Sequence, residues 1–159
     1  TGSGCISISL AKKFPQISIT AIDVSQEAVS LATENAELND VKNINFIVAD
    51  FFDYLPSERY DIIVSNPPYV IESDLPNLQK ELSYEPRIAL TAGNDPIAFY
   101  KRFIDYFDFL EDGGKMFLEI NEKNSHDVTN LLSKVSIVKV IKDYSKMDRI
   151  LLLKKITNL

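Results

Sequence analysis

The chain has 159 residues, of which 45% are hydrophobic and 25% are charged, and its formal net charge at pH 7 is −6. This length and composition predict one globular domain, because a chain of about 150 residues can bury about 68–70% of its unfolded surface. The acidic balance disfavours extended nucleic-acid binding, since phosphate backbones attract basic surfaces.

The rare residue types exclude further classes of protein. A single cysteine, Cys5, excludes an internal disulfide framework and favours a reducing compartment, so we expect a cytoplasmic protein. A single histidine, His126, excludes most histidine-based metal sites and triads, and no metal is expected. No apolar run reaches the roughly 18 residues of a membrane span, so no membrane partner is expected.

Helical and extended apolar patterns alternate along the chain. After a turn at Gly2 and Gly4, a helical pattern ends at Phe14-Pro15. Ser25 caps a second helix, Asp95-Pro96 begins a third that Gly113-Gly114 ends, and residues 125–132 form a fourth. Extended patterns cover residues 17–22, 44–48, 60–64, 115–120, 135–141 and 149–153. The polar stretch from Glu72 to Asn94 is too long for a simple connection, and such loops are usually functional.

This alternation predicts an α/β fold with a parallel sheet covered on both faces. The segment 142–148 is too short for a crossover, so the last two strands should form an antiparallel hairpin. Ligands of open α/β sheets bind beyond the carboxyl ends of the strands. Asp23, Asp50 and Asn66 would share that edge, and Glu119 is a further candidate.

Thr1-Gly2-Ser3-Gly4 is a candidate nucleotide loop, because Asp23 follows it at about the 20-residue spacing typical of a ribose-binding acid. A structural turn is the alternative, and the spacing fits NAD and S-adenosylmethionine alike. Ser7 stands where a dinucleotide fingerprint has its third glycine, which disfavours a pyrophosphate cradle.

Among the remaining candidates, Asp50, Phe51 and Glu119 each allow two interpretations. Asp50 with Phe51 could hold and cover an adenine, or could form a helix cap followed by core aromatics. Glu119 could be an acid beside the cofactor or the polar end of a strand. We expect Cys5 to be a small buried residue, and His126 to be solvated or at a helix start, without a functional role.

The stretch Ser65-Asn66-Pro67-Pro68-Tyr69 follows the apolar run of the third strand. It could be a rigid turn, since proline fixes φ and restrains the residue before it. Alternatively, the Asn66 side-chain oxygen and the Pro67 carbonyl offer two fixed acceptors to one NH2 group, and Tyr69 can stack on a planar amide or base. Methyl transfer from a sulfonium needs such positioning, and it needs no histidine, nucleophilic serine or metal.

Several segments together resemble a class I S-adenosylmethionine-dependent methyltransferase of the HemK (PrmC) type, which methylates release-factor glutamine. They are T-G-S-G at the start, D-V-S from Asp23, N-P-P-Y from Asn66, Y-E-P-R-I-A-L from Tyr84, then Ala92-Gly93, the helix at Asp95, and Lys142-Asp143-Tyr144 with Asp148-Arg149. The resemblance covers essentially the whole chain. N-P-P-Y alone is shared with amino-methyltransferases of nucleic acids.

The resemblance implies a role for each matching residue. The S-adenosyl-L-methionine site would comprise Thr1, Gly2, Ser3, Gly4, Asp23 at the ribose, Asp50 and Phe51 at the adenine, and Asn66. The glutamine would be gripped by Asn66, Pro67, Pro68 and Tyr69, of which Asn66, Pro67 and Tyr69 would be catalytic. Asn94, Pro96 and Asn121 stand where the family usually has glycine.

The resemblance also implies a fold and a partner. The fold is a Rossmann-like class I methyltransferase sheet, mostly parallel, with an antiparallel C-terminal hairpin. In that family a helical substrate-binding domain and a first strand precede Thr1, so residues 1–159 would be the catalytic domain, truncated at its N-terminus. The partner would be the Gly-Gly-Gln domain of a peptide chain release factor. A ribosomal-protein glutamine methyltransferase, a nucleic-acid amino-methyltransferase and a non-catalytic cofactor-binding module are the alternatives.

Overall fold

The computed structural model describes residues 1–78, 80, 84–91 and 93–155. Ala92, which contributes to the resemblance, lies outside these residues. The chain divides into two compact units, Thr1–Leu55 and Pro56–Leu159, and each has its own sheet.

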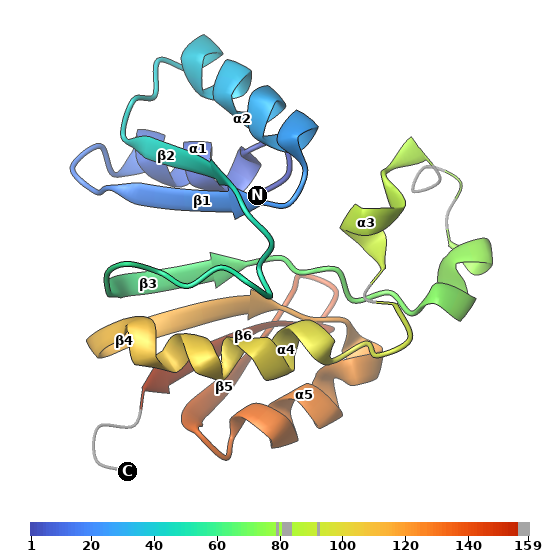
Figure 1. Cartoon of the computed structure of the whole chain (residues 1–159). Coiled ribbons are helices and arrows are strands. Elements are labelled where there is room, and N and C mark those ends of the chain that lie inside the picture. The colour runs from blue at the N-terminus through green and yellow to red at the C-terminus, as the bar shows by residue number, and fades with distance from the viewer. Residues whose placement is uncertain (79, 81–83, 92, 156–159) are drawn as a thin grey trace. The chain divides into compact units, whose positions relative to one another are not determined.

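The first unit is a two-stranded parallel sheet with two helices (Figure 1). Ser25 forms the predicted cap, since its side chain accepts a hydrogen bond of 3.1 Å from the Ala28 N–H. Both helices pack on the sheet and on each other. The elements are α1 Cys5–Lys13, β1 Ile19–Asp23, α2 Gln26–Leu38 and β2 Ile44–Val48.

The second unit is a four-stranded sheet in the order β3-β4-β6-β5. β3 and β4 are parallel, while β6 runs antiparallel to both β4 and β5, so the predicted hairpin is confirmed. The strands are β3 Tyr60–Ser65, β4 Leu110–Glu119, β5 Ser136–Lys142 and β6 Asp148–Lys155. The helices are η1 Glu72–Asn77, α3 Arg87–Leu90, α4 Ala98–Phe103, η3 Asp105–Phe109, η4 Glu122–Asn124 and α5 Ser125–Leu132.

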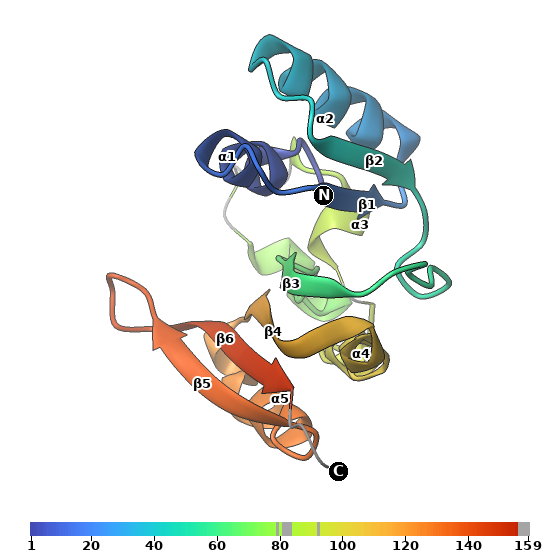
Figure 2. The ribbon, with the colours of Figure 1, turned by 90° about the vertical axis from the view of Figure 1, so that its left-hand side faces the viewer.

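The core of the second unit lies on one face of this sheet. Met116 pairs with Leu153 and Leu118 with Leu151, and all four side chains are fully buried. Alternate strand residues share a face, so these four form one apolar layer. α4 and α5 cover that layer (Figures 1 and 2) and add the buried side chains of Tyr100, Val128 and Leu132.

The helix expected from Asp95 to Gly113-Gly114 is wrong in its extent. Asp95 does accept a hydrogen bond from the Ile97 N–H, but α4 ends at Phe103, and Gly113-Gly114 lies inside β4. The register between β3 and β4 shifts at this point, which is a bulge. A Cβ at Gly114 would lie 2.8 Å from the Glu111 carbonyl oxygen, so the glycine permits the close backbone approach of the bulge.

The long polar loop after β3 is closed at its base. Val70 and Thr91 form a parallel β-bridge, the Val70 N–H donates to the Leu90 carbonyl, and the Glu72 N–H donates to the Gly93 carbonyl. Above this base, Arg87 and Glu72 form an ion pair of 2.6 Å. The stretch predicted to be more than a simple connection contains two short helices, η1 and α3.

The hairpin between β5 and β6 is organised by Asp143. Its carboxylate accepts hydrogen bonds from the N–H groups of Ser145 and Met147 and from Arg149 Nε. The Met147 N–H, assisted by Arg149 and Ser145, holds the pKa of Asp143 below the usual 3.8. The carboxylate form therefore stabilises the turn. None of the helices in the described part of the chain is long and apolar enough to cross a membrane.

The apolar layer predicts a large cost for truncating a central side chain. Leu151→Ala should lower the free energy of unfolding by about 2–5 kcal/mol, because it leaves a cavity in a fully buried position. The matched Ile137→Ala removes a side chain that is 62% exposed and should cost about 1 kcal/mol at most. Urea denaturation of both variants measures the difference, and equal costs would contradict this account of the core.

The hairpin turn predicts a pH-dependent stability. The pKa of Asp143 is lower in the folded state, so its contribution is fully present above the unfolded value near 3.8 and is lost as pH falls through the folded pKa. The difference in unfolding free energy between wild type and Asp143→Asn should therefore shrink below pH 3.8. The exposed Asp112→Asn is the matched control. A difference that stays constant between pH 7 and pH 2 would show that the Asp143 charge does not stabilise the turn.

Candidate active site

The predicted site residues lie at strand ends, as expected, within each unit. β1 and β2 are parallel, so Asp23 and Asp50 lie at the same edge of the first sheet. Ser65 of β3 pairs with Leu118 of β4, which places Asn66 and Glu119 at the same edge of the second sheet. The structure thus assembles two groups of candidate residues, one in each unit.

Asp23 ties the glycine loop to the end of β1. Its Oδ2 atom lies 2.8 Å from the backbone nitrogens of Thr1 and Gly2, and its Oδ1 atom accepts a hydrogen bond of 3.0 Å from the Ser25 N–H. Burial raises the pKa of Asp23, while the hydrogen bond and charge of the Thr1 ammonium, together with the N–H groups of Gly2 and Ser25, lower it overall. The group is an anion at neutral pH. A carboxylate has about four lone-pair sites, so Asp23 can still accept from a further donor.

The glycine loop is held against α2 by a hydrogen bond from Asn35 and by close packing at Gly4. Asn35 of α2 donates a hydrogen bond of 2.9 Å to the Ser3 carbonyl. Gly4 has φ of +81°, and a Cβ there would lie 3.0 Å from Ile8 and 3.1 Å from Ala32. A side chain at Gly4 would therefore be strained and would separate α1 from α2. At Gly2, by contrast, a Cβ would meet no atom within 4 Å, so the turn is open there.

The remaining candidates of the first unit are less organised. Asp50 Oδ1 accepts a hydrogen bond from the Phe52 N–H, so the carboxylate caps the turn that follows β2. Phe51 is half-buried and contacts Phe52 edge to face. Cys5 is exposed, which corrects the expectation of a buried residue, because the first turn of α1 presents it outward.

In the second unit, Asn66 presents an exposed side-chain amide. This side chain makes no hydrogen bond to any residue that the structure describes. Pro67, directly after it, is buried, and Pro68 is half-buried. The prolines thus fix the backbone against the protein while the Asn66 side chain keeps both its acceptor and its donors available.

Tyr69 is held by Glu119. The tyrosine hydroxyl donates a hydrogen bond of 3.4 Å to Glu119 Oε1, and the Tyr100 hydroxyl donates one of 2.8 Å to the Glu119 carbonyl. Burial and then the charge of Glu119 raise the pKa of Tyr69, while Arg149 acts in the opposite direction. Burial likewise raises the pKa of Tyr100. Both phenols are therefore neutral and can donate.

Sequence reasoning missed the role of Arg149. Its Nε atom bonds to Asp143, its carbonyl accepts from the Ile120 N–H, and its charge acts on Tyr69. The segment around Arg149 contributed to the resemblance, but nothing in the local pattern connected a hairpin residue to a tyrosine 80 positions earlier. His126 lies in the first turn of α5 and is exposed, as expected. The described residues contain no cluster of three or more His, Cys, Asp or Glu side chains able to hold a metal.

Comparisons with known proteins match this fold and most of the chain. The chain is 39% identical over 159 residues to the release factor glutamine methyltransferase of Thermodesulfovibrio yellowstonii, an alignment that covers 98% of this chain and 57% of the relative. It is 38% identical over 122 residues to the ribosomal protein uL3 glutamine methyltransferase of Francisella tularensis, covering 76% of this chain and 39% of the relative. The crystal structure of a methyltransferase from Pyrococcus furiosus superposes with a TM-score of 0.68 at 22% identity, covering 98% of this chain and 71% of that one.

The chain spans about half the length of the curated relatives it matches, with shares of 57%, 45% and 56% in three of them. The family model described as "Methyltransferase small domain" matches residues 1–130. That range includes the glycine loop, Asp23, the strand-end N-P-P-Y and Glu119. The chain therefore belongs to the methyltransferase small domain family.

Proposed function

We propose that the protein transfers a methyl group from S-adenosyl-L-methionine to the side-chain amide nitrogen of the glutamine in the Gly-Gly-Gln motif of peptide chain release factors. The observation that carries the proposal is the exposed Asn66 amide on a proline-fixed strand end, beside a tyrosine held by Glu119. The glycine-loop unit would serve the methyl donor, and the N-P-P-Y unit the methyl acceptor.

The first unit fits an adenosine-bearing sulfonium cofactor. Asp23 keeps acceptor capacity for ribose hydroxyl groups, and the turn is open at Gly2. Phe51 and Asp50 are at the end of the neighbouring strand, where an adenine needs an aromatic cover and an acceptor. When bound, the cofactor supplies an activated methyl group, so the protein contributes position and electrostatics.

The second unit fits a primary amide as acceptor. The Asn66 side-chain oxygen and the Pro67 carbonyl accept hydrogen bonds from the two N–H groups of the glutamine amide. An amide nitrogen is a poor nucleophile, because its lone pair is shared with the carbonyl. Acceptors that strengthen as positive charge develops on that nitrogen stabilise the transition state more than the ground state. Tyr69, held by Glu119, would pack against the planar amide.

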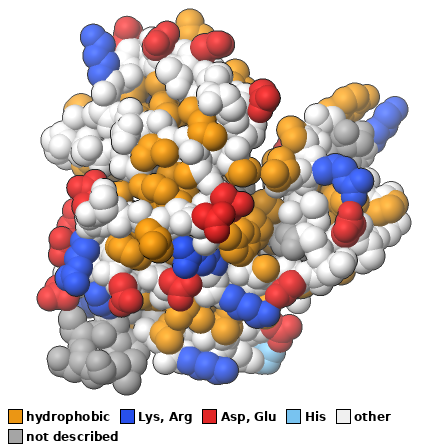
Figure 3. Space-filling view, viewed as in Figure 1, with side chains coloured by type: hydrophobic (Ala, Val, Ile, Leu, Met, Phe, Trp, Pro, Cys, Tyr) orange, Lys and Arg blue, Asp and Glu red, His pale blue; other side chains and the backbone are white. Residues whose placement is uncertain are grey.

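Two other kinds of substrate also offer an NH2 group to the Asn66 side-chain oxygen and the Pro67 carbonyl. A ribosomal-protein glutamine presents the same primary amide, and one relative carries that name. An amino group on a nucleic-acid base would also fit Asn66, but the net charge is −6. On the face shown in Figure 3, basic and acidic side chains of the second unit are interspersed instead of forming a basic patch. Phosphate recognition is therefore disfavoured.

The length comparison supports a proposal about domain organisation. Since the alignments cover about half of each curated relative, we infer that residues 1–159 are the catalytic domain of a longer enzyme, and that a substrate-binding helical domain belongs to it. Tests of function therefore use the full-length enzyme. Competition among release factor, ribosomal protein and RNA for labelled methyl groups identifies the preferred substrate.

The ribose proposal predicts a defined loss of cofactor affinity. Asp23→Ala should weaken S-adenosylmethionine binding by about 1.5–3 kcal/mol, the usual contribution of hydrogen bonds to a charged group. Titration calorimetry measures the change. Glu34→Ala, which removes an exposed carboxylate from α2, is the matched control and should leave affinity unchanged. Equal affinities of wild type and Asp23→Ala would restrict Asp23 to its structural role at the turn.

The proposed hydrogen bonds from the glutamine amide to Asn66 and Pro67 predict that replacing Asn66 lowers turnover. Asn66→Ala should lower kcat by on the order of 10²-fold, by analogy with the loss of one oxyanion-hole donor, while cofactor affinity changes little. Replacing the acceptor glutamine with glutamate should also abolish transfer, since a carboxylate brings no donors to the two acceptors. Methyl incorporation into the release factor measures both effects. A near wild-type rate after either change would mean that N-P-P-Y is only a turn.

A further inference from the structure

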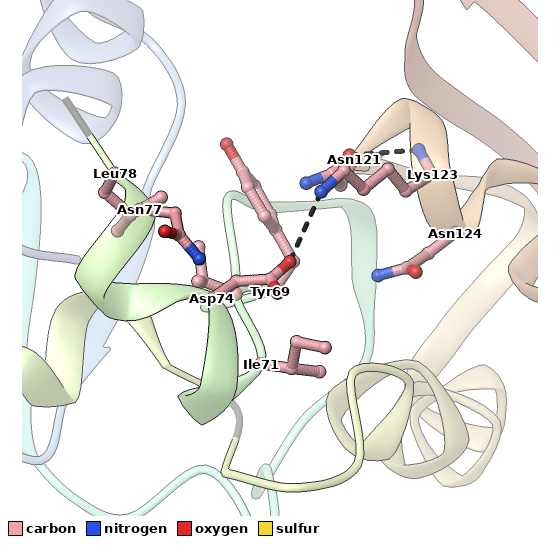
Figure 4. Close-up of a pocket in the computed structure, with 9 residues that line it drawn as sticks. Tyr69, Ile71, Asp74, Asn77, Leu78, Asn121, Lys123 and Asn124 are labelled. Atoms are coloured by element: carbon pink, nitrogen blue, oxygen red, sulfur yellow. Dashed lines mark hydrogen bonds and ion pairs between the residues drawn. The ribbon is translucent and has the colours of Figure 1, made fainter.

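A cavity of about 200 Å³ adjoins Tyr69 within the second unit (Figure 4). One wall is the loop that follows the N-P-P-Y segment, and the other is the turn that follows β4. Its polar lining consists of Tyr69, Asp74, Asn77, Asn121, Lys123 and Asn124. The cavity therefore lies next to the last residue of the proposed glutamine site. Its volume is smaller than the ~300–1,000 Å³ of sites for drug-sized ligands.

The lining has hydrogen-bonding capacity that the protein does not use. The side chains of Asn77 and Asn124 make no hydrogen bond to any described residue, although both line the cavity. Asn121 uses its oxygen to accept from the Lys123 N–H, which leaves its NH2 group available. Primary amides both donate and accept, so they complement the N–H and C=O groups of a peptide main chain.

The charged side chains of the lining are paired with each other. Lys123 Nζ lies 3.3 Å from Asp74 Oδ2, so one ion pair connects the two walls, as Figure 4 shows. Lys123 is 77% exposed and has further N–H donors. With one cation and one anion, the polar lining has no net charge. Such a surface suits a neutral ligand better than a phosphate or a carboxylate.

We propose that this cavity binds the main chain of the substrate residues next to the methylated glutamine, with Asn77 and Asn124 as specificity-determining residues. The proposal rests on the proposed function, since it assumes a protein glutamine as the acceptor. The small volume and amide lining favour a short run of small residues such as the two glycines of Gly-Gly-Gln. The glutamine side chain would go to Asn66 and Pro67, and Tyr69 would contact both segments.

The test uses the full-length enzyme with Asn77→Ala, Asn124→Ala and the double variant. Each loses one amide that can bond the substrate main chain, so KM for the release factor should rise about 3- to 10-fold per substitution. kcat at saturating substrate and the cofactor Kd should change by less than about twofold, because neither residue contacts the reacting amide. Asn130→Ala is the matched control, since it removes an exposed amide from the outer surface of α5.

The outcomes separate this proposal from the proposed function. If wild-type enzyme does not methylate the release factor, the proposed function fails and this inference fails with it. If wild type is active but KM of the double variant equals that of wild type or of Asn130→Ala, only the cavity assignment is overturned. Calorimetry with a Gly-Gly-Gln peptide gives a second measurement: its Kd should rise with the same variants. Asn77 is exposed, so Asn77→Ala decides the question even if Asn124→Ala impairs folding.

Discussion

Glu119, the last residue of β4, accepts hydrogen bonds from two tyrosines, and the arrangement of the second unit depends on it. Its carbonyl receives the Tyr100 hydroxyl from α4, and its carboxylate receives the Tyr69 hydroxyl from the loop after β3. One strand end thus contacts both the helix that covers the core and the loop that would hold the substrate. Asp23 has the same role in the first unit, where its carboxylate joins β1 to the glycine loop.

Much of this arrangement could be predicted from the sequence because its signals are local. The strand at residues 44–48 and the helix at residues 125–132 have the predicted bounds, since the first is a nearly continuous apolar run and the second has apolar side chains at helical spacing. The cap at Ser25 and the antiparallel hairpin follow from similarly short-range rules. Parallel strand geometry brings carboxyl ends to one edge of a sheet, which accounts for Asp23 with Asp50 in the first unit and for Asn66 with Glu119 in the second.

Other features depend on contacts between distant residues and were therefore not predictable. The pair Gly113-Gly114 is typical of a helix end, yet it lies in a β-bulge of β4. That bulge arises from the pairing of β4 with β3. The exposure of Cys5 depends on how α1 packs. The cavity beside Asn124 requires the pairing of β3 with β4, and the link from Arg149 to Tyr69 also requires the pairing of β4 with β6. Pattern reasoning has no access to such pairings.

The bridge between Val70 and Thr91 has a consequence for how this enzyme family can diversify. It closes the excursion from Glu72 to Leu90 at its base, so the ends of that segment stay fixed whatever its interior contains. Doubling the length of a closed flexible loop costs only about 0.6 kcal/mol in closure entropy. The segment can therefore be lengthened, shortened or exchanged without displacing Tyr69, so its length and sequence can vary while the strand end before it keeps its position.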